Sequence, residues 1–181
     1  MHLPLQAAYR LYALWDVHTA VRIAVTDPRH DTPAETRNRM SKKYNGHCAC
    51  GAVTYGFDTE PSFVANCHCT DCKRASGGEM ATIALVSDDD LTVSGGETKS
   101  FSYGPSTETC AGQGLDRVFC VACGSRTFSN NMKDFPGQVF VQEGTLDKLD
   151  EWFPPQMEIF TWSRQPWMKP LDVPQFDHGP Q

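Results

Sequence analysis

The feature that most restricts the fold of this chain is a short run with three cysteines, Cys67, Cys69 and Cys72. If Cys67 and Cys69 lie on extended backbone, their side chains point to the same face, because side chains alternate along a strand. Cys72 follows at a spacing that lets a further ligand approach across a tight turn. The pattern therefore predicts that three sulfur atoms converge on one metal ion.

Three cysteines leave the nature of this site open. A structural zinc site has four protein ligands, whereas a catalytic site has three and keeps one position open. We favour an open metal site; a disulfide and a closed zinc site with a fourth ligand from elsewhere are the alternatives. His68 would be that ligand only if the backbone is not extended, since on a strand it faces away from its neighbours.

Two further motifs predict a second metal site. Cys120 and Cys123 form a CxxC motif followed by glycine, which is typical of a zinc knuckle. This pair needs two more ligands, and Cys48 and Cys50 supply them. We expect a Cys₄ zinc site that closes a loop of roughly 70 residues and stabilises the fold by several kcal/mol, by analogy with a covalent cross-link. The alternative, a disulfide within each pair, does not suit a reducing compartment.

The composition limits the classes of partner. The chain has 181 residues, a formal net charge of -6 and 40% hydrophobic residues, as expected for one globular domain with a tail or two. The acidic balance argues against binding to nucleic acid or to an anionic membrane surface, because both require basic patches. Residues 11–25, the most apolar N-terminal stretch, are too few and too polar to span a bilayer. With eight cysteines and no recognisable secretory signal, we expect thiolates, zinc and a cytoplasmic location.

Residues 1–43 differ from the rest of the chain, because they are rich in arginine and contain no cysteine. We expect an N-terminal extension that is helical or disordered. An amphipathic helix fits residues 6–25, and Pro28 and Pro33 then break the pattern. There are two other interpretations of these residues: they form a targeting segment, or the true start of the protein is Met40.

From residue 44 onward the sequence predicts an all-β domain, because strand-like runs alternate with turns and long helical patterns are absent. Gly95 and Gly96 lie between two short strand-like runs and predict a hairpin. The predicted strands are residues 52–57, 63–66, 80–86, 91–94, 99–103, 138–142 and 157–162.

The C-terminal tail, residues 166–181, is rich in proline. Three large apolar side chains are candidates to pack it on the surface of the core, namely Trp167, Leu171 and Phe176. We therefore expect the tail to belong to a domain that spans residues 44–180.

Two cations and a glycine close to the three-cysteine run are candidate substrate-binding residues. Lys73 and Arg74 would stabilise three thiolates around a zinc ion, which together carry one net negative charge, and would attract an anionic substrate. A pair of solvated surface charges is the simpler explanation. Gly77 would let backbone N–H groups approach a ligand, although an ordinary turn explains it nearly as well.

The three cysteine motifs, in this order, resemble those of the GFA family, named for glutathione-dependent formaldehyde-activating enzymes. The resemblance covers residues 44–180 and rests on residues 46–53, 67–77 and 117–125. It implies a compact β-tent fold of short antiparallel sheets with two zinc ions. By motif position, it implies a structural zinc site of Cys48, Cys50, Cys120 and Cys123 and a catalytic zinc site of Cys67, Cys69 and Cys72.

The resemblance also implies an activity, the carbon–sulfur lyase reaction that interconverts S-hydroxymethylglutathione with glutathione and formaldehyde. The residues suit it, because a thiol that enters an open position on zinc is deprotonated at neutral pH. We therefore expect a zinc-dependent carbon–sulfur lyase whose partner is a small thiol or thiol adduct. Two other functions are a non-catalytic binding or scaffold module, since a vertebrate centromere protein shares this domain, and a thiol or zinc sensor that works through Cys67 and Cys69.

Overall fold

The computed structural model describes residues 41–103, 114–147 and 153–179. These residues form eleven strands, one short α-helix and two 3₁₀ turns, which confirms the all-β class. In chain order the elements are β1 (Tyr44–His47), β2 (Val53–Phe57), β3 (Phe63–Cys67), α2 (Thr70–Ser76), β4 (Ala81–Ser87), β5 (Thr92–Gly95), β6 (Thr98–Tyr103), β7 (Leu115–Cys120), β8 (Arg126–Asn130), β9 (Gln138–Gln142), η4 (Glu143–Thr145), β10 (Met157–Ile159), η6 (Thr161–Ser163) and β11 (Gln175–Phe176). The predicted extension, apart from residues 41–43, lies outside the described residues, as does Cys110.

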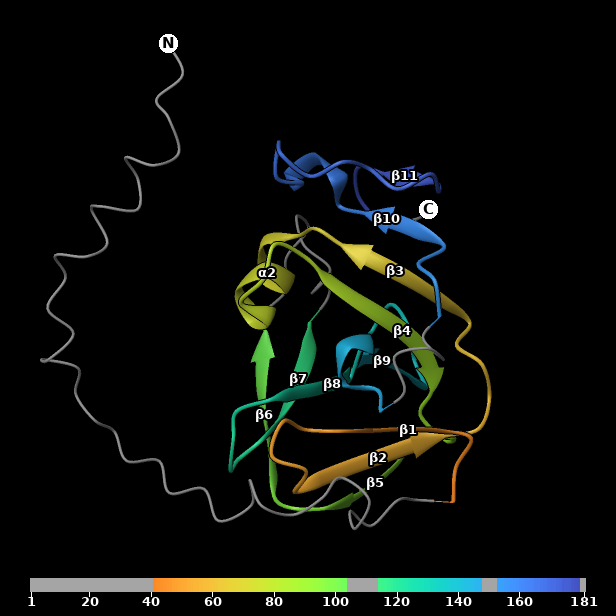
Figure 1. The fold of residues 1–181 in the computed structure, drawn as a ribbon, viewed down its shortest axis with the longest axis vertical. Helices are drawn as coiled ribbons and strands as arrows, with labels where there is room; N and C mark the ends of the chain where they lie inside the picture. The colour runs from red at the N-terminus through yellow and green to blue at the C-terminus, as the bar shows by residue number, and fades with distance from the viewer. Residues whose placement is uncertain (1–40, 104–113, 148–152, 180–181) are drawn as a thin grey trace, which may run out of the picture. The chain divides into compact units, whose positions relative to one another are not determined.

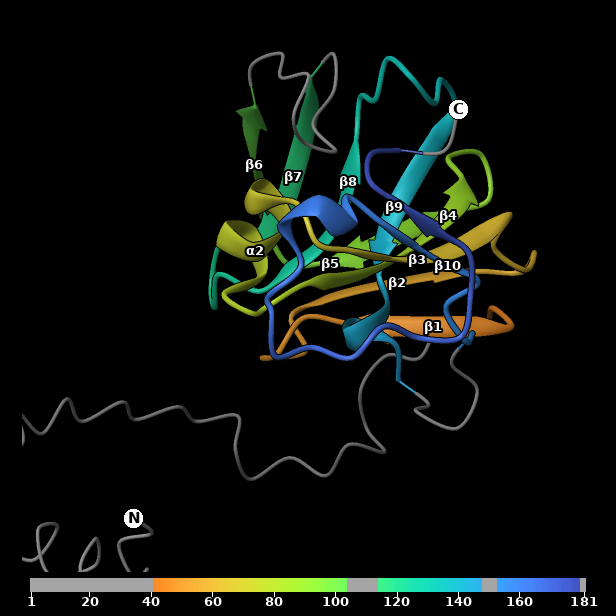
Figure 2. The same ribbon diagram turned by 90° about the horizontal axis from the view of Figure 1, so that it is seen from above.

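The strands form two sheets (Figure 1, Figure 2). A three-stranded sheet has the order β1-β2-β5, and an eight-stranded sheet has the order β11-β10-β3-β4-β9-β8-β7-β6. Neighbouring strands are antiparallel except at one edge, where β10 runs parallel to both β3 and β11. The predictions for β2, β3, β4 and β9 are confirmed to within one residue at each end.

The two faces of the eight-stranded sheet cover two separate cores, because side chains alternate along each strand. One face packs against the three-stranded sheet. The core on this side is formed by Tyr55, Phe57, Val86, Val118, Phe128, Val139, Val141 and Leu146. The run of three cysteines lies on the opposite side. The core there includes Ala65, Cys67, Cys69, Cys72, Ala81, Ile83, Leu85 and Phe140.

The predicted hairpin around Gly95 and Gly96 is wrong. β5 pairs with β2 in the three-stranded sheet, whereas β6 pairs with β7 in the eight-stranded sheet. Gly95 has a φ of 92°, and a Cβ atom on it would lie 2.2 Å from the carbonyl oxygen of Ala52. Gly96 donates a backbone hydrogen bond of 2.6 Å to the same oxygen. The two glycines therefore let the chain pass close to Ala52 as it crosses from one sheet to the other.

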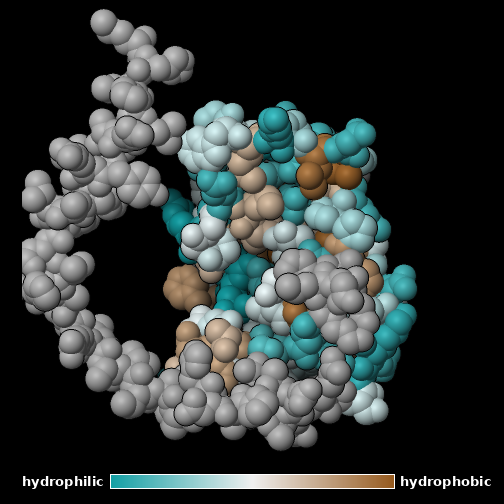
Figure 3. Space-filling model, viewed as in Figure 1, coloured by the Kyte–Doolittle hydropathy of each residue, from teal (hydrophilic) through white to brown (hydrophobic). Residues whose placement is uncertain are grey.

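The C-terminal part of the chain departs from two expectations. The predicted strand 157–162 ends at Ile159, because Phe160 adopts a left-handed conformation with φ of 56° and starts the turn η6. Of the three predicted anchors, Phe176 is partly buried against the core, but Trp167 and Leu171 are 66% and 43% exposed. On the face of the molecule shown in Figure 3, hydrophobic residues lie in small groups separated by hydrophilic ones.

Polar contacts replace the missing apolar anchors of this tail. The indole nitrogen of Trp167 donates to Glu79 at 2.6 Å, and the backbone N–H of Leu171 donates to buried Glu158 at 2.9 Å. The tail is therefore attached to the domain through hydrogen bonds at the two positions where the sequence predicts apolar packing.

Candidate metal centres

The first cluster of cysteines joins the two sheets. Cys48 and Cys50 lie in the turn between β1 and β2, whereas Cys120 ends β7 and Cys123 lies in the turn that leads to β8. The four sulfur atoms all lie within 4.8 Å of one another. The structure thus brings together the four residues that the sequence assigns to one site.

Two similar turns place these sulfur atoms. The N–H of Gly51 donates to the carbonyl of Cys48 at 2.8 Å, and the N–H of Gly124 donates to the carbonyl of Cys120 at the same distance. Both glycines have a φ of 72°, in the left-handed region where residues with a Cβ atom are strained. Each glycine therefore closes a tight turn around one pair of cysteines.

The sulfur spacing fits a tetrahedral metal ion and excludes disulfides. The Cys48 and Cys50 sulfurs are 3.5 Å apart, and those of Cys50 and Cys120 are 3.8 Å apart. A disulfide would require about 2.05 Å. Metal–sulfur bonds of about 2.3 Å in a tetrahedron place neighbouring sulfurs about 3.8 Å apart. None of the described cysteines forms a disulfide.

The pKa values of the thiols in this cluster also favour the binding of a cation. Burial raises the pKa of Cys48 to about 12, although the N–H of Val53 donates to its sulfur at 3.2 Å. The pKa of Cys123 falls to about 7, because the N–H groups of Ser125 and Cys50 and the adjacent thiols outweigh the effect of burial. Four thiols in contact do not all ionise without a nearby positive charge, so a divalent ion would stabilise the thiolate form.

The second cluster comes from a strand end and the first turn of a helix. Cys67 ends β3, Cys69 is the N-cap of α2, and Cys72 lies in the first turn of α2. Cys69 has extended backbone angles, and its sulfur accepts a hydrogen bond of 3.3 Å from the N–H of Cys72. The three sulfurs lie within 4.8 Å of one another, and all three residues are at most 1% exposed.

A buried arginine faces this second cluster. Arg117 on β7 is 4% exposed, and its Nη2 atom donates to the sulfur of Cys72 at 3.9 Å. Burial of a guanidinium is costly unless negative charge lies nearby. Its position beside three cysteines therefore suits a thiolate cluster better than a neutral one.

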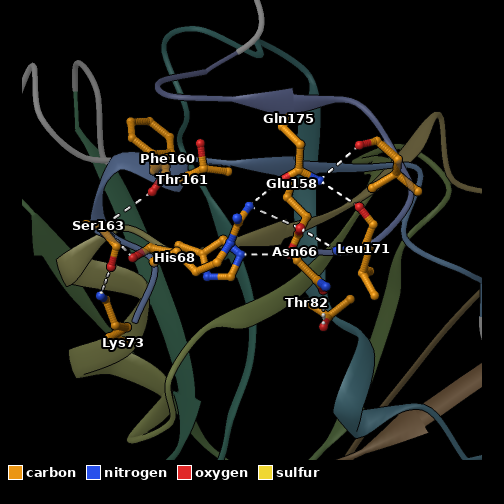
Figure 4. Close-up of polar contacts among 12 residues, drawn as sticks. Asn66, His68, Lys73, Thr82, Glu158, Phe160, Thr161, Ser163, Leu171 and Gln175 are labelled. Carbon is orange, nitrogen blue, oxygen red and sulfur yellow. Dashed lines mark hydrogen bonds and ion pairs between the residues drawn. The ribbon is translucent and has the colours of Figure 1, made fainter. Parts of the chain in front are cut away.

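His68 lies between two of these cysteines but contacts a different group. Its side chain is fully buried, and its Nε2 atom lies 2.9 Å from the carboxylate of Glu158 on β10 (Figure 4). Its backbone N–H donates to Ile159 and its carbonyl accepts from the hydroxyl of Ser163. Among the described residues, therefore, His68 is not a fourth ligand, and no other histidine, cysteine or carboxylate joins the cluster of three.

Glu158 connects this histidine to the C-terminal tail. One carboxylate oxygen accepts from His68, and the other accepts from Arg164 at 3.1 Å and from the N–H of Leu171 at 2.9 Å. Figure 4 shows His68 and Leu171 on opposite sides of the carboxylate of Glu158. Burial opposes ionisation of Glu158, yet these hydrogen bonds and the Arg164 charge hold its pKa below the usual value.

The three predicted substrate-binding residues all lie on or just after α2. The Nζ atom of Lys73 donates to the carbonyl of Ser163, and Arg74 lies 3.7 Å from Asp71 with its side chain 74% exposed. Gly77 caps the helix in the left-handed region, with φ of 69°, and donates its N–H to the carbonyl of Lys73. Of these three residues, only Arg74 is thus an exposed cation.

These features define a class, an all-β protein with two thiolate-rich centres, one of four cysteines and one of three. Both donor sets suit a divalent metal that prefers sulfur. A sequence model of the family described as glutathione-dependent formaldehyde-activating enzyme, GFA, matches residues 43–163. The chain belongs to the GFA family, as the cysteine motifs predict.

A solved structure gives a further comparison. The chain is similar to a Rhodobacter sphaeroides protein of known crystal structure, with 25% sequence identity over 58% of this chain and 89% of that chain and a TM-score of 0.46. Separately, none of the helices within the described ranges is long and apolar enough to cross a membrane.

Sequence reasoning missed three polar residues around the cluster of three cysteines: Arg117, Glu158 and Arg164. Each lies far along the chain from the cysteines that it supports. The available signal was an ionisable residue at a strand position between apolar ones, as for Arg117, which lies two residues after Leu115 and directly before Val118. Such a residue is rarely buried unless it has a partner.

Proposed function

We propose that this protein is a zinc-dependent carbon–sulfur lyase that acts on the adduct of a small thiol, such as S-hydroxymethylglutathione. The observation that carries the proposal is the cluster of Cys67, Cys69 and Cys72, which has three ligands and no fourth among the described residues. Three protein ligands with one open position are typical of catalytic zinc sites. Family membership supports the choice of a thiol adduct as substrate.

The two clusters then have different roles. Cys48, Cys50, Cys120 and Cys123 would hold a structural zinc ion, since their four sulfurs complete a tetrahedral set. At the cluster of three, zinc would lower the pKa of an entering thiol and so hold it as a thiolate at neutral pH. The chain itself supplies the three sulfurs that orient this position.

The surrounding residues would support that cluster through charge and position. Arg117 offsets the negative charge of the thiolates, because its guanidinium donates to the sulfur of Cys72. His68 and Glu158 fix the backbone between Cys67 and Cys69 from the other side. Precise ligand placement of this kind depends on such outer contacts.

Lys73, Arg74 and Gly77 stay in the proposal as candidate substrate-binding residues. Arg74 is the best placed to attract an anionic thiol, because its side chain is 74% exposed. Lys73 would act less directly, since it bonds the carbonyl of Ser163 and so holds the tail against α2. Gly77 would contribute through the tight helix end that it permits.

We propose residues 44–180 as the functional domain, beyond the matched residues 43–163, because Arg164 and Leu171 both bond Glu158. We also propose a cytoplasmic location. Its support is that the described cysteines form no disulfide and are grouped at metal-binding distances, which suits a reducing compartment.

Metal retention separates the sensor alternative from the lyase. A cluster that senses oxidation would release its metal when Cys67 and Cys69 oxidise. Stoichiometric zinc in both clusters under air would therefore argue against a sensor.

The test combines metal analysis with turnover. Protein purified without chelator should contain two equivalents of zinc, and Cys69→Ser should contain one while keeping its fold. NMR exchange spectroscopy should show that the wild type interconverts glutathione, formaldehyde and their adduct faster than the uncatalysed reaction, and that Cys69→Ser does not. Cys110→Ser, outside all three motifs, is the matched control and should retain both properties. Full turnover by Cys69→Ser would rule out the cluster as the reaction centre.

A further inference from the structure

Ser163 ends the turn η6 and lies 95 residues after His68 in the sequence, yet it contacts the run of three cysteines at two points. Its hydroxyl donates to the carbonyl of His68 at 2.7 Å, and its own carbonyl accepts from the Nζ atom of Lys73 (Figure 4). These two partners flank the segment that carries Cys69 and Cys72. Ser163 therefore contacts the cysteine run on both sides of that segment.

The contact with His68 fixes the backbone next to two of the cysteines. The carbonyl of His68 belongs to the planar peptide group that joins it to Cys69. The N–H of His68 belongs to the peptide group that joins it to Cys67, and it donates to the carbonyl of Ile159 at 3.0 Å. Both peptide groups between Cys67 and Cys69 are thus held by residues 159–163. Because peptide orientation sets the direction of the neighbouring side chains, these bonds determine how the two sulfurs point.

The contact with Lys73 extends this support to the third cysteine. Cys69 is the N-cap of α2, and the backbone N–H of Lys73 donates to its carbonyl at 3.1 Å. This bond encloses Cys72, which lies directly before Lys73. Since the side chain of Lys73 bonds the carbonyl of Ser163, the start of α2 keeps a defined position relative to η6.

The needs of the turn itself do not account for the hydroxyl of Ser163. A serine in a turn commonly bonds the backbone of that turn. Ser163 makes such a contact with the carbonyl of Phe160, but at 3.3 Å it is longer than the contact of 2.7 Å with His68. The backbone N–H of Ser163 already donates to the same carbonyl of Phe160 at 3.2 Å. The main partner of the hydroxyl is therefore the cysteine run.

We propose that Ser163 is a positioning residue for a metal ion at Cys67, Cys69 and Cys72. Its hydroxyl acts through the backbone of His68 and keeps the three sulfurs in the arrangement that binds a divalent metal. Outer contacts of this kind usually contribute about 10–100-fold to metal affinity. The inference rests on the proposed function only in taking this cluster to bind metal, and it adds the turn η6 to the metal centre.

The test measures the metal affinity of each cluster in the full-length protein, with Co²⁺ in place of zinc. Thiolate-bound Co²⁺ absorbs visible light, and its bands depend on the geometry of the ligands. The wild type should bind two equivalents, which Cys69→Ser and Cys120→Ser assign to the cluster of three and the cluster of four. In Ser163→Ala, the affinity of the cluster of three should fall about tenfold or more and its bands should shift, whereas the cluster of four should not change. Ser163→Thr keeps a hydroxyl and should recover most of the affinity.

Thr161→Ala is the matched control, because it removes a hydroxyl of the same turn whose partner is Asp177 at 3.0 Å. It should leave both clusters unchanged. Lys73→Met removes the second contact of Ser163 and should weaken the cluster of three independently. Circular dichroism verifies that each variant is folded. Wild-type affinity and bands at the cluster of three in Ser163→Ala would overturn the proposal, as would an equal loss at both clusters or an equal loss in Thr161→Ala.

The same variants separate this inference from the proposed function. If Ser163→Ala weakens the cluster of three while the wild type turns over no hydroxymethyl adduct, the lyase function fails and the positioning role stands. If the wild type is an active lyase and Ser163→Ala binds metal as tightly as the wild type, the inference fails alone. A wild type that binds metal only at the cluster of four would refute both.

Discussion

Replacement of Glu158 tests whether the structure gives the correct account of the tail. The carboxylate is 2% exposed and accepts hydrogen bonds from His68 at 2.9 Å, Arg164 at 3.1 Å and the N–H of Leu171 at 2.9 Å. Glu158→Ala would leave a half-buried guanidinium, a buried imidazole and a backbone N–H without their shared acceptor.

The magnitude follows from these contacts. Removing one member of a buried charged pair costs about 3–5 kcal/mol, and each unsatisfied buried group about 1–3 kcal/mol. Because the three contacts share one carboxylate, these values do not add. We expect Glu158→Ala to lower the free energy of unfolding by about 3–5 kcal/mol. Glu158→Gln should lower it by about half as much, because the amide keeps the shape and one acceptor oxygen.

Equilibrium unfolding in urea, followed by tryptophan fluorescence at a fixed zinc concentration, measures these differences. Glu97→Ala is the matched control, since Glu97 is exposed and should change stability by less than about 0.5 kcal/mol. Limited proteolysis should also cut Glu158→Ala within residues 164–179 before other sites. A loss below about 1 kcal/mol in Glu158→Ala, with proteolysis as in the wild type, would refute the reasoning.

The difference in stability between the wild type and the Glu158 variants should depend on pH in a defined direction. Hydrogen bonds from His68 and Leu171, with Gln175 and the charge of Arg164, outweigh burial and hold the pKa of Glu158 below its usual value. A group with a lowered folded pKa stabilises the protein above its unfolded pKa, and this contribution is lost as pH falls through the folded pKa. The difference in stability between wild type and Glu158→Gln should therefore narrow below about pH 4.

Three further predictions concern other parts of the domain. Gly95→Ala should destabilise the protein by about 1–3 kcal/mol, because φ is 92° and the new Cβ would meet Ala52, whereas Gly144→Ala, with nothing within 4 Å, should be nearly neutral in urea unfolding. Burial raises the pKa of Glu143 to about 7, so the wild type should lose stability as pH rises through 7. Between pH 5 and 8.5, the free energy of unfolding of Glu143→Gln should come to exceed that of the wild type by up to about 3 kcal/mol in the same assay. Chelation of the metal should lower the thermal midpoint reversibly. Cys120→Ser should lower the midpoint more than Cys69→Ser, because Cys120 belongs to the cluster that joins the two sheets. Calorimetry with and without added zinc measures both effects.

The cysteine clusters were predictable because ligand spacing is a local property. Cys67, Cys69 and Cys72 need only a strand end and a turn to converge. The CxxC motif of Cys120 and Cys123 supplies two of four zinc ligands, so it required two partners from elsewhere in the chain. An alternating strand such as β2 and a continuous apolar strand such as β4 were likewise predictable from sequence. These signals depend on a few neighbouring residues and not on the tertiary structure.

The parts that were missed depend on tertiary contacts. α2 has seven residues and a cysteine as its N-cap, so it lacks both the length and the usual capping residue of a recognisable helix. The crossing at Gly95 looks like a hairpin in sequence, and only pairing with β2 and β7 distinguishes the two. The contacts of Glu158 with His68 span 90 residues, a separation at which no local pattern gives a signal.

Arg117 provides a test of how the cluster of three tolerates its charge. A zinc ion with three thiolates carries one net negative charge, and the guanidinium of Arg117 donates to the sulfur of Cys72 at 3.9 Å. Two unit charges about 4 Å apart attract by about 4 kcal/mol at an effective dielectric constant of about 20. Loss of such an outer contact typically weakens metal binding about 10–100-fold.

Arg117→Met should therefore weaken zinc binding at the cluster of three and leave the cluster of four unchanged. Overall stability should also fall, because removal of one member of a buried charged pair leaves the other member without compensation. Competition with a chromogenic chelator should resolve one weakened and one unchanged equivalent in Arg117→Met, and partial recovery in Arg117→Lys. If both equivalents of Arg117→Met compete as in the wild type, Arg117 does not stabilise the thiolates and its burial has another cause.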